Sequence, residues 1–227
     1  MERKTPLYQT HVDAGGKIVE FGGFLMPVQY PTGVLAEHMA VRQKAGLFDV
    51  SHMGELRLKG PDAVANVQKL ITADISAMQD GDIKYAMFCN DAGGILDDFI
   101  VYRCAADDYW LVVNAGNRDK DAAWVESHLF GDVDYRDEGD DWGQVALQGP
   151  KSSDILKKLC AEQYIPAKYY TFIDNVSLDL GSRTIHALVS QTGYTGEYGF
   201  EIYCRAEDTV DLWHALLAAG EEYGLIP

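Results

Sequence analysis

The sequence contains few cysteines, and none of them stands in a metal-binding pattern. Cys89, Cys104, Cys160 and Cys204 lie far apart, without a C-x-x-C pair and without a histidine at metal-ligand spacing beside them. This spacing argues against a structural zinc site and against a disulfide framework. We therefore expect reduced thiols in a cytoplasmic protein that holds no metal.

Basic residues and long apolar runs are scarce as well. Lysine and arginine number 19 against 35 acidic residues, which gives a formal net charge of −16. A field of this sign repels nucleic acid and anionic lipid surfaces. No apolar run approaches the roughly 20 residues that span a bilayer, and the charged N-terminus lacks the apolar core of a secretory signal. We expect no nucleic-acid partner and no membrane partner.

The chain does contain an internal echo, by which we mean two segments of similar sequence. With 227 residues, 47% of them hydrophobic, it can form one large domain or two smaller modules. Leu58-Lys59-Gly60-Pro61 precedes Val67-Gln68-Lys69-Leu70, and Leu147-Gln148-Gly149-Pro150 precedes Leu156-Lys157-Lys158-Leu159 at the same offset. Each copy predicts a strand, a glycine turn and a helix with one apolar face. The echo indicates two copies of one unit.

Further hairpins and helices predicted from the sequence make each copy part of an α+β module. Hairpins are predicted within 85–103 and 176–189, and helices at 117–129 and at 207–223, the latter capped by Gly224. The acidic stretch 132–141 is expected to be an exposed connector. We predict a discontinuous first module, residues 1–50 with 142–227, and a second module, residues 51–141. The surface between two equivalent modules is a natural place for a ligand.

The densest unusual stretch runs from Ser190 to Glu201 and has glycines at every third position. Two acids, Glu197 and Glu201, would repel phosphate, and the spacing is not that of a dinucleotide loop. A carboxylate such as Glu201 can accept two parallel N–H bonds from a flat heterocycle that Tyr194 could border. Pterins and purines both fit. The alternative is a tight glycine-rich hairpin with exposed acids.

Two adjacent acids, Asp97 and Asp98, stand inside an apolar strand pattern. Burying an ionised carboxylate is costly unless it is paired or hydrogen-bonded, so we expect one of the two to have a dedicated partner. Alternation gives both acids apolar neighbours on their own face, so periodicity does not choose between them. The alternative is an aspartate satisfied by turn amides.

The stretch around His52 offers no further catalytic set. His52 is expected in an alternating strand without an acid and a nucleophile nearby, which favours a structural histidine. Ser51 lacks the elbow motif of a nucleophile. The sequence contains no recognisable triad, metal site or phosphate-binding loop.

Five segments, in order along the chain, together resemble the aminomethyltransferase, or T-protein, of the glycine cleavage system. They are Thr5-Pro6-Leu7-Tyr8, Phe21 to Tyr30, Leu47 to Met53, Asn90 to Asp98 and Thr192 to Glu197. The resemblance covers nearly the whole chain and is far more specific than any one motif. It implies a cloverleaf-type fold in which two related α+β modules pack around a central folate cavity, with the C-terminal barrel domain absent from this chain.

The resemblance also implies a reaction. The family moves an aminomethyl group from the dihydrolipoyl arm of lipoylated H-protein to tetrahydrofolate, releasing ammonia and forming methylenetetrahydrofolate. Carried over residue by residue, it implies that Asp98 is the catalytic carboxylate and that Glu201 reads the amino-pyrimidine edge of the pterin. It further implies a folate cavity lined by Tyr194, Tyr85, Tyr102, Asn114 and Met53.

Two departures from the family pattern modify this expectation. Gln191 stands where many relatives carry arginine, and the arginines that hold the folate tail in the family follow Gly224, beyond this chain. Residues 225–227 follow a helix cap with no element to bury them, so we expect a truncated or proteolysed fragment. Because the cations that compensate the folate tail are expected in the missing region, we expect weak folate binding and little turnover. The alternatives are a folate-dependent demethylase of the same fold, a non-catalytic folate-binding protein, and an α+β protein without a ligand.

Overall fold

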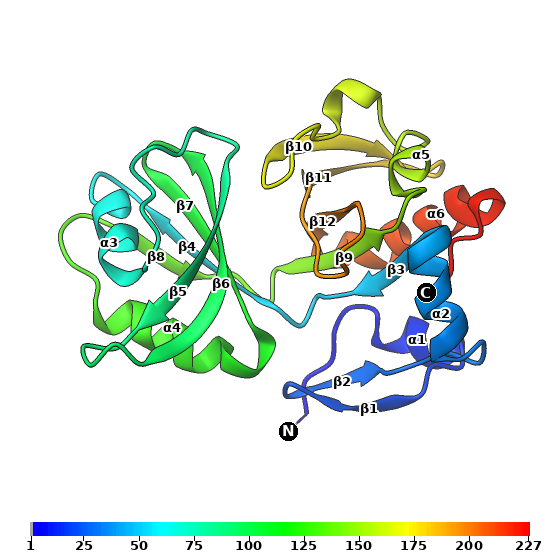
Figure 1. Cartoon of the computed structure of the whole chain (residues 1–227), viewed down its shortest axis with the longest axis horizontal. Coiled ribbons are helices and arrows are strands. Elements are labelled where there is room, and N and C mark those ends of the chain that lie inside the picture. Colours follow the sequence, from blue (N-terminus) through cyan, green and yellow to red (C-terminus); the bar gives the residue numbers. More distant parts are fainter. Residues whose placement is uncertain (1) are drawn as a thin grey trace. The chain divides into compact units, whose positions relative to one another are not determined.

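The computed structural model describes residues 2–227, which fold into antiparallel sheets and the helices that pack on them (Figure 1). Its contacts divide the chain into two compact units, Met1–His52 with Asp141–Pro227 and Met53–Asp140. We call these the first unit and the second unit. Within residues 2–227, no helix is both long enough and apolar enough to cross a membrane. The α+β class expected from the sequence is confirmed.

The second unit is built on a five-stranded antiparallel sheet in the order β5-β6-β7-β4-β8. The strands are β4 (Gly54–Lys59), β5 (Ile83–Cys89), β6 (Ile95–Ala105), β7 (Asp108–Val113) and β8 (Asp134–Asp137). Helix α3 (Ala63–Leu70) packs on β4 and β7. The short helix η1 (Ala115–Asn117) follows β7 and leads into α4 (Arg118–Ser127).

The first unit is built on a sheet of the same kind, in the order β10-β11-β12-β9-β3. Its strands are β3 (Gly46–Asp49), β9 (Trp142–Gln148), β10 (Phe172–Asp179), β11 (Thr184–Ser190) and β12 (Gly199–Arg205). A separate hairpin joins β1 (Ile18–Phe21) and β2 (Phe24–Pro27). The helices are α1 (Tyr8–Asp13), α2 (Val34–Gln43), α5 (Ser152–Leu156), η2 (Glu162–Tyr164), η3 (Ala206–Asp208), α6 (Thr209–Gly220) and η4 (Glu221–Tyr223).

The two sheets confirm the internal repeat. Four successive strands take the same order in both, since β5-β6-β7-β4 corresponds to β10-β11-β12-β9. In each copy the first strand is followed by a glycine with a positive φ, a backbone conformation that favours glycine. These are Gly60 at φ 131° and Gly149 at φ 126°. The same turn then starts the helix, because the N–H groups of Ala63 and Ser152 donate to the carbonyls of Gly60 and Gly149, each at 3.0 Å.

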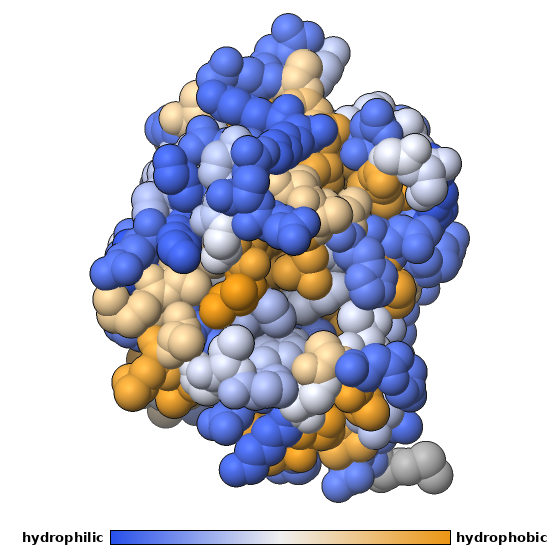
Figure 2. Space-filling model, turned by 90° about the vertical axis from the view of Figure 1, so that its right-hand side faces the viewer, coloured by the Kyte–Doolittle hydropathy of each residue, from blue (hydrophilic) through white to orange (hydrophobic). Residues whose placement is uncertain are grey.

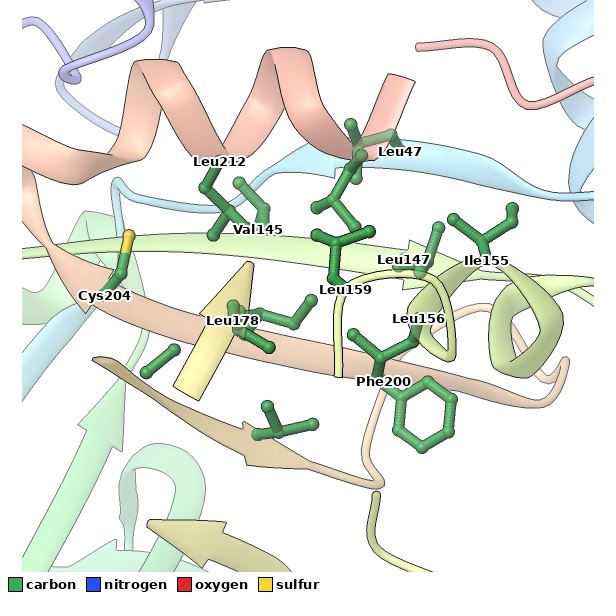
Figure 3. Packing of buried hydrophobic residues seen from close by; sticks show 14 of the residues in the cluster. Leu47, Val145, Leu147, Ile155, Leu156, Leu159, Leu178, Phe200, Cys204 and Leu212 are labelled. Atoms are coloured by element: carbon green, nitrogen blue, oxygen red, sulfur yellow. The ribbon is translucent and has the colours of Figure 1, made fainter. Parts of the chain in front are cut away.

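Each unit has its own core between its sheet and its helices. In the first unit, Val145 and Leu147 from β9 and Phe200 from β12 belong to one buried cluster with Leu212 from α6 (Figure 3). In the second unit, the corresponding cluster joins residues of β4, β5, β6 and β7 to residues of α3 and α4. Because burying a leucine or valine side chain contributes roughly 1.5–3 kcal/mol, these clusters stabilise each unit separately.

Strand alternation gives each sheet a core face and a second face that we call the reverse face. On β6, Phe99 and Val101 belong to the core, so Asp98 lies on the reverse face. On β12, Phe200 belongs to the core and Glu201 lies on the reverse face. The same parity carries the even-numbered residues of β7 to the reverse face of the second unit.

Three local expectations are wrong. The acidic stretch 132–141 contains β8, which pairs with β4 at the sheet edge, where charged side chains oppose pairing with another chain. His52 lies in a turn between β3 and β4, not in a strand, and its ring packs edge to face on Phe21 and Phe24. The last residues are not left without a partner, because Leu225 joins the first unit's core and the N–H of Leu47 donates to the carbonyl of Ile226 at 3.0 Å.

Replacing the repeat's turn glycine should destabilise the first unit. A Cβ at Gly149 would lie 2.7 Å from the carbonyl oxygens of Val41 and Lys44, and the φ of this residue is unfavourable for alanine. We expect Gly149→Ala to cost about 2–4 kcal/mol of unfolding free energy, which lowers Tm by about 5–10 °C. Gly116→Ala, at a position with open space, is the matched control and should leave Tm within about 2 °C. Equal melting of the two variants, measured by calorimetry, would contradict this account of the turn.

Candidate functional site

Asp98 lies on the reverse face of the second unit, with its carboxylate exposed. The Tyr85 hydroxyl, from the neighbouring strand β5, donates to Asp98 Oδ2 at 2.7 Å. Asn114, just after β7, donates from Nδ2 to the Asp98 backbone carbonyl at 2.7 Å and lies 3.5 Å from Asp98 Oδ1. Two polar side chains from adjacent strands therefore hold Asp98 while its carboxylate stays accessible.

Asp97 points the other way and is buried, with 5% of its surface exposed. It accepts hydrogen bonds from Asn117 Nδ2 at 2.7 Å and from both the side chain and the backbone N–H of Asn114, at 3.1 and 3.3 Å. Burial acts to raise the pKa of Asp97, but hydrogen bonds from Asp121, Asn114 and Asn117 outweigh it and lower the pKa. The dedicated partner expected for one of the two acids is confirmed, and it belongs to Asp97.

A third acid, Asp121 on α4, lies beside Asp97 and was not predicted from the sequence. Its side chain is fully buried. Burial first, and then the hydrogen bond and negative charge of Asp97, raise the pKa of Asp121 to about 8. Lys120 is the nearby cation, with Nζ 3.8 Å from Asp121 Oδ1. Burial and the neighbouring Asp97 therefore both favour the neutral form of Asp121.

The other two residues that the resemblance assigned to this unit lie in different surroundings. Tyr102 is completely buried and packs edge to face on Trp110, with ring centroids 5.8 Å apart. Met53 is half-buried and directly precedes β4. Of the five residues predicted in the second unit, the structure thus brings Asp98, Tyr85 and Asn114 into direct contact.

Glu201 lies on the reverse face of the first unit, on β12. Gln144 Nε2 donates to Glu201 Oε1 at 3.0 Å, and the Thr192 hydroxyl donates to Glu201 Oε2. Burial raises the pKa of Glu201, and the hydrogen bonds from Thr192 and Gln144 partly oppose this shift. The carboxylate is consequently held in one orientation by two neutral donors.

Two buried amide oxygens of the first unit lack hydrogen-bond donors within the described chain, and one of them belongs to Gln144, whose Nε2 donates to Glu201. Gln144 Oε1 and Gln191 Oε1 are buried and receive no hydrogen bond from any residue in 2–227. A buried carbonyl oxygen without a donor is costly, so such groups call for an N–H or O–H from elsewhere. Gln191 directly precedes Thr192 and is the residue that departs from the family pattern. This part of the first unit fits a ligand that presents hydrogen-bond donors.

The glycine-rich stretch is organised by Gln148 of the repeat motif. Gln148 is buried and donates from Nε2 to the carbonyls of Thr192 and Phe200, at 3.1 and 3.2 Å. A Cβ at Gly193 would lie 2.0 Å from Gln148 Oε1, and one at Gly199 would lie 2.5 Å from Gln148 Nε2. These two glycines make room for a glutamine side chain.

Tyr194 does not reach Glu201 by a hydrogen bond within the described chain. Its side chain is fully exposed at the tip of the stretch, on one rim of a cavity of about 430 Å³ that is also lined by Phe48 and Arg42. Arg42 donates to the Thr195 carbonyl at 2.8 Å and pairs with Glu197 at 2.9 Å. Figure 2 faces the side of the first unit where α2 and α6 lie, and apolar residues break its hydrophilic surface there. Tyr194 therefore borders a cavity that is partly lined by apolar side chains.

A buried group of hydrogen-bonded side chains in the first unit was also not predicted from the sequence. His11 Nε2 lies 2.9 Å from Asp49 Oδ2, and His11 Nδ1 lies 2.8 Å from the Tyr30 hydroxyl. Thr5 and the N–H of Ser51 donate to the same Asp49 carboxylate, at 2.7 and 2.9 Å. The contact between His11 and Asp49 could not be predicted from the sequence, because Asp49 lies 38 residues after His11. This set ties the N-terminal segment to β3.

The predicted site residues fall into both units, with Met53, Tyr85, Asp98, Tyr102 and Asn114 in the second and Tyr194 and Glu201 in the first. That the two groups face one cavity stays a prediction. Across residues 2–227, no cluster of three or more histidine, cysteine, aspartate or glutamate side chains is arranged to hold a metal ion.

Comparison with known proteins gives consistent matches along the chain. Residues 7–227 match the family model described as the GCVT N-terminal domain. The chain is 46% identical over 227 residues to an aminomethyltransferase of Anoxybacillus flavithermus and 45% identical to one of Geobacillus sp., covering all of this chain and 61% of each relative. The chain thus spans about three fifths of the length of these relatives.

Solved structures match as well. The crystal structure of the glycine cleavage system aminomethyltransferase T from Bartonella henselae superposes with a TM-score of 0.87 at 32% identity, over 100% of this chain and 59% of that one. A chain of the heterotetrameric sarcosine oxidase from Corynebacterium sp. U-96 superposes with a TM-score of 0.62 at 17% identity, over 97% of this chain and 96% of that one. The second likeness concerns the fold alone.

Removing one donor should change the acidity of Glu201. Because the Thr192 hydroxyl stabilises the ionised carboxylate, Thr192→Val should raise the pKa of Glu201 further. Carboxyl ¹³C chemical shifts followed through a pH titration measure this directly. Thr195→Val is the matched control, since the Thr195 hydroxyl donates to Gln148 and not to Glu201. An equal Glu201 titration in the wild type and Thr192→Val would show that this contact is unimportant.

Proposed function

Since this chain belongs to the GCVT N-terminal domain family, we propose that it takes part in aminomethyl transfer in the glycine cleavage system. The donor is the aminomethyl group on the dihydrolipoyl arm of lipoylated H-protein, and the acceptor is tetrahydrofolate. The products are methylenetetrahydrofolate, ammonia and the free dihydrolipoyl thiol. Both folate N–H groups become bonded to the methylene carbon, and their protons are taken up by the departing thiol and amine.

The accessible Asp98 carboxylate is the observation that carries this proposal. Of the two adjacent acids, Asp97 has its oxygens occupied by N–H donors of Asn114 and Asn117, whereas Asp98 keeps acceptor capacity on the reverse face. A carboxylate held by Tyr85 and Asn114 can orient a folate N–H and accept its proton as the nitrogen forms a bond to carbon. Asp98 is therefore assigned the catalytic role, and Tyr85 and Asn114 are assigned to positioning and to folate contact.

The surroundings of Glu201 support recognition of the pterin in the first unit. A 2-amino-pyrimidinone edge presents adjacent N–H donors, which match the Glu201 carboxylate and the buried oxygen of the neighbouring Gln144 amide. Glu201 is assigned to that edge, and Tyr194, Tyr102 and Met53 to apolar contacts with the folate. Each of these assignments depends on tetrahydrofolate being the ligand.

Neutralising Asp98 should remove transfer without removing binding. In the purified protein, Asp98→Asn keeps the size and the hydrogen-bonding shape of the side chain but lacks a base, so we expect turnover to fall by about 10²- to 10⁴-fold. The Kd for tetrahydrofolate should stay within about threefold. Tyr85→Phe, which removes one partner of Asp98, should have the smaller effect of about tenfold.

The measurement is methylenetetrahydrofolate formation from aminomethylated H-protein, run in parallel with free methyl donors. Unchanged turnover in Asp98→Asn would remove this residue from the mechanism. Activity with free methyl donors and none with the carrier protein would replace aminomethyl transfer by folate-dependent demethylation.

Neutralising Glu201 should act on binding. Because a hydrogen bond to a charged group contributes about 1.5–3 kcal/mol, Glu201→Gln should weaken tetrahydrofolate binding by about 10- to 100-fold in isothermal titration. Glu197→Gln is the matched control, as this acid pairs with Arg42 at the surface and should leave the affinity unchanged. Equal affinities of the two variants would assign the pterin edge to another residue.

A further inference from the structure

Behind Asp98, two buried acids and one half-buried asparagine form a continuous network. Asp97 on β6, Asp121 on α4 and Asn114 after β7 come from three different elements, and they meet on the core side of the strand that carries Asp98. A buried carboxylate without compensation would be costly, and two ionised carboxylates in contact would be more so. Such an arrangement is stable only if its charge and donors are balanced.

The hydrogen-bond donors around Asp97 and Asp121 determine which of the two carboxyl groups carries a proton. Asp97 accepts three N–H bonds, from Asn117 and from the side chain and backbone of Asn114. Asp121, by contrast, receives no N–H or O–H donor from residues 2–227, and Lys120 Nζ stays at 3.8 Å. Two carboxylates only accept, so their contact becomes a hydrogen bond when one of them is protonated. The acid without donors, Asp121, is the one that carries the proton and donates it to Asp97.

The network reaches Asp98 through a single amide. Asn114 Nδ2 donates to Asp97 Oδ1 at 3.1 Å and to the Asp98 backbone carbonyl at 2.7 Å. Since both of these partners are acceptors, the amide must present its NH₂ group to them, and Asn114 Oδ1 must point away. The backbone N–H of Asn114 is held by Asp97 as well, so the orientation of the whole residue is fixed.

We propose that Asp97 and Asp121 share one proton as a buried pair that fixes the amide of Asn114 and, through it, positions Asp98 for reaction. The consequence for catalysis rests on the proposed function, whereas the shared proton and the fixed amide do not. Asp97 and Asp121 touch no substrate in this scheme. They are positioning residues.

The shared proton is tested in the wild-type protein, without any substitution. Carboxyl ¹³C spectra should show one of the two acids still protonated at neutral pH, titrating with an apparent pKa near 8. Lys120 is the charged group beside this pair, so it is followed in the same titration. Two carboxylates that are fully ionised at pH 6 would overturn the proposal.

The positioning effect is tested by a pair of Asp121 variants. Asp121→Asn keeps an N–H donor toward Asp97, and Asp121→Leu has a similar volume without a donor. We expect the side-chain amide signals of Asn114 to stay in place in the first variant, and to shift and exchange hydrogen at least about tenfold faster in the second. With substrate, kcat should fall about 10- to 100-fold in Asp121→Leu while the Kd for tetrahydrofolate stays within about threefold, and Asp121→Asn should restore kcat.

A buried control separates positioning from loss of stability. Asn66 is fully buried in the same unit and bonds to the backbone of Asp62 and Phe130, so Asn66→Ala should lower Tm but leave the Asn114 signals and kcat unchanged. Equal losses in Asp121→Asn and Asp121→Leu, or an unmoved Asn114 amide in Asp121→Leu, would refute the positioning role. If the wild type neither binds tetrahydrofolate nor transfers the aminomethyl group, the proposed function fails, and the titration and amide measurements still decide the buried pair.

Discussion

Alternation along the β-strands is the constraint on which the rest of this structure depends. Each residue step turns a side chain to the other face of the sheet, so one face can pack on helices while the other carries polar groups. The neighbours Asp97 and Asp98 are the sharpest case, because one step separates a buried acid with several donors from an accessible one. On β12, Phe200 and Glu201 repeat this contrast between core and reverse face.

The internal repeat explains why two candidate groups arise in one chain. Both units follow one strand order and start their first helix with the same glycine turn, so each has a core face and a reverse face of the same kind. The polar residues on the reverse faces differ, however. The second unit carries Asp98 with a hydrogen bond from the Tyr85 hydroxyl, and the first carries Glu201 with a hydrogen bond from the Gln144 amide.

Local patterns were sufficient to predict the repeat, both hairpins and the later helices, because each depends on neighbours within a few residues. The glycine at 224, for example, has the left-handed backbone expected of a helix cap. Contacts between distant segments were not predictable in this way. The bond between His11 and Asp49 spans 38 residues, Asp121 meets Asp97 across two elements, and β8 forms only because β4 offers a sheet edge. The choice of Asp98 over Asp97 came from resemblance, since periodicity alone gives both acids apolar neighbours.

The place of Gln148 between Gly193 and Gly199 makes the three positions a single steric unit. Any side chain added at either glycine competes for the volume that the glutamine occupies, so changes at these sites are expected to be strongly non-additive. A library that diversifies the exposed loop around Tyr194 therefore has to vary residue 148 together with it, and a shorter side chain there opens conformations of the loop that the natural glutamine forbids.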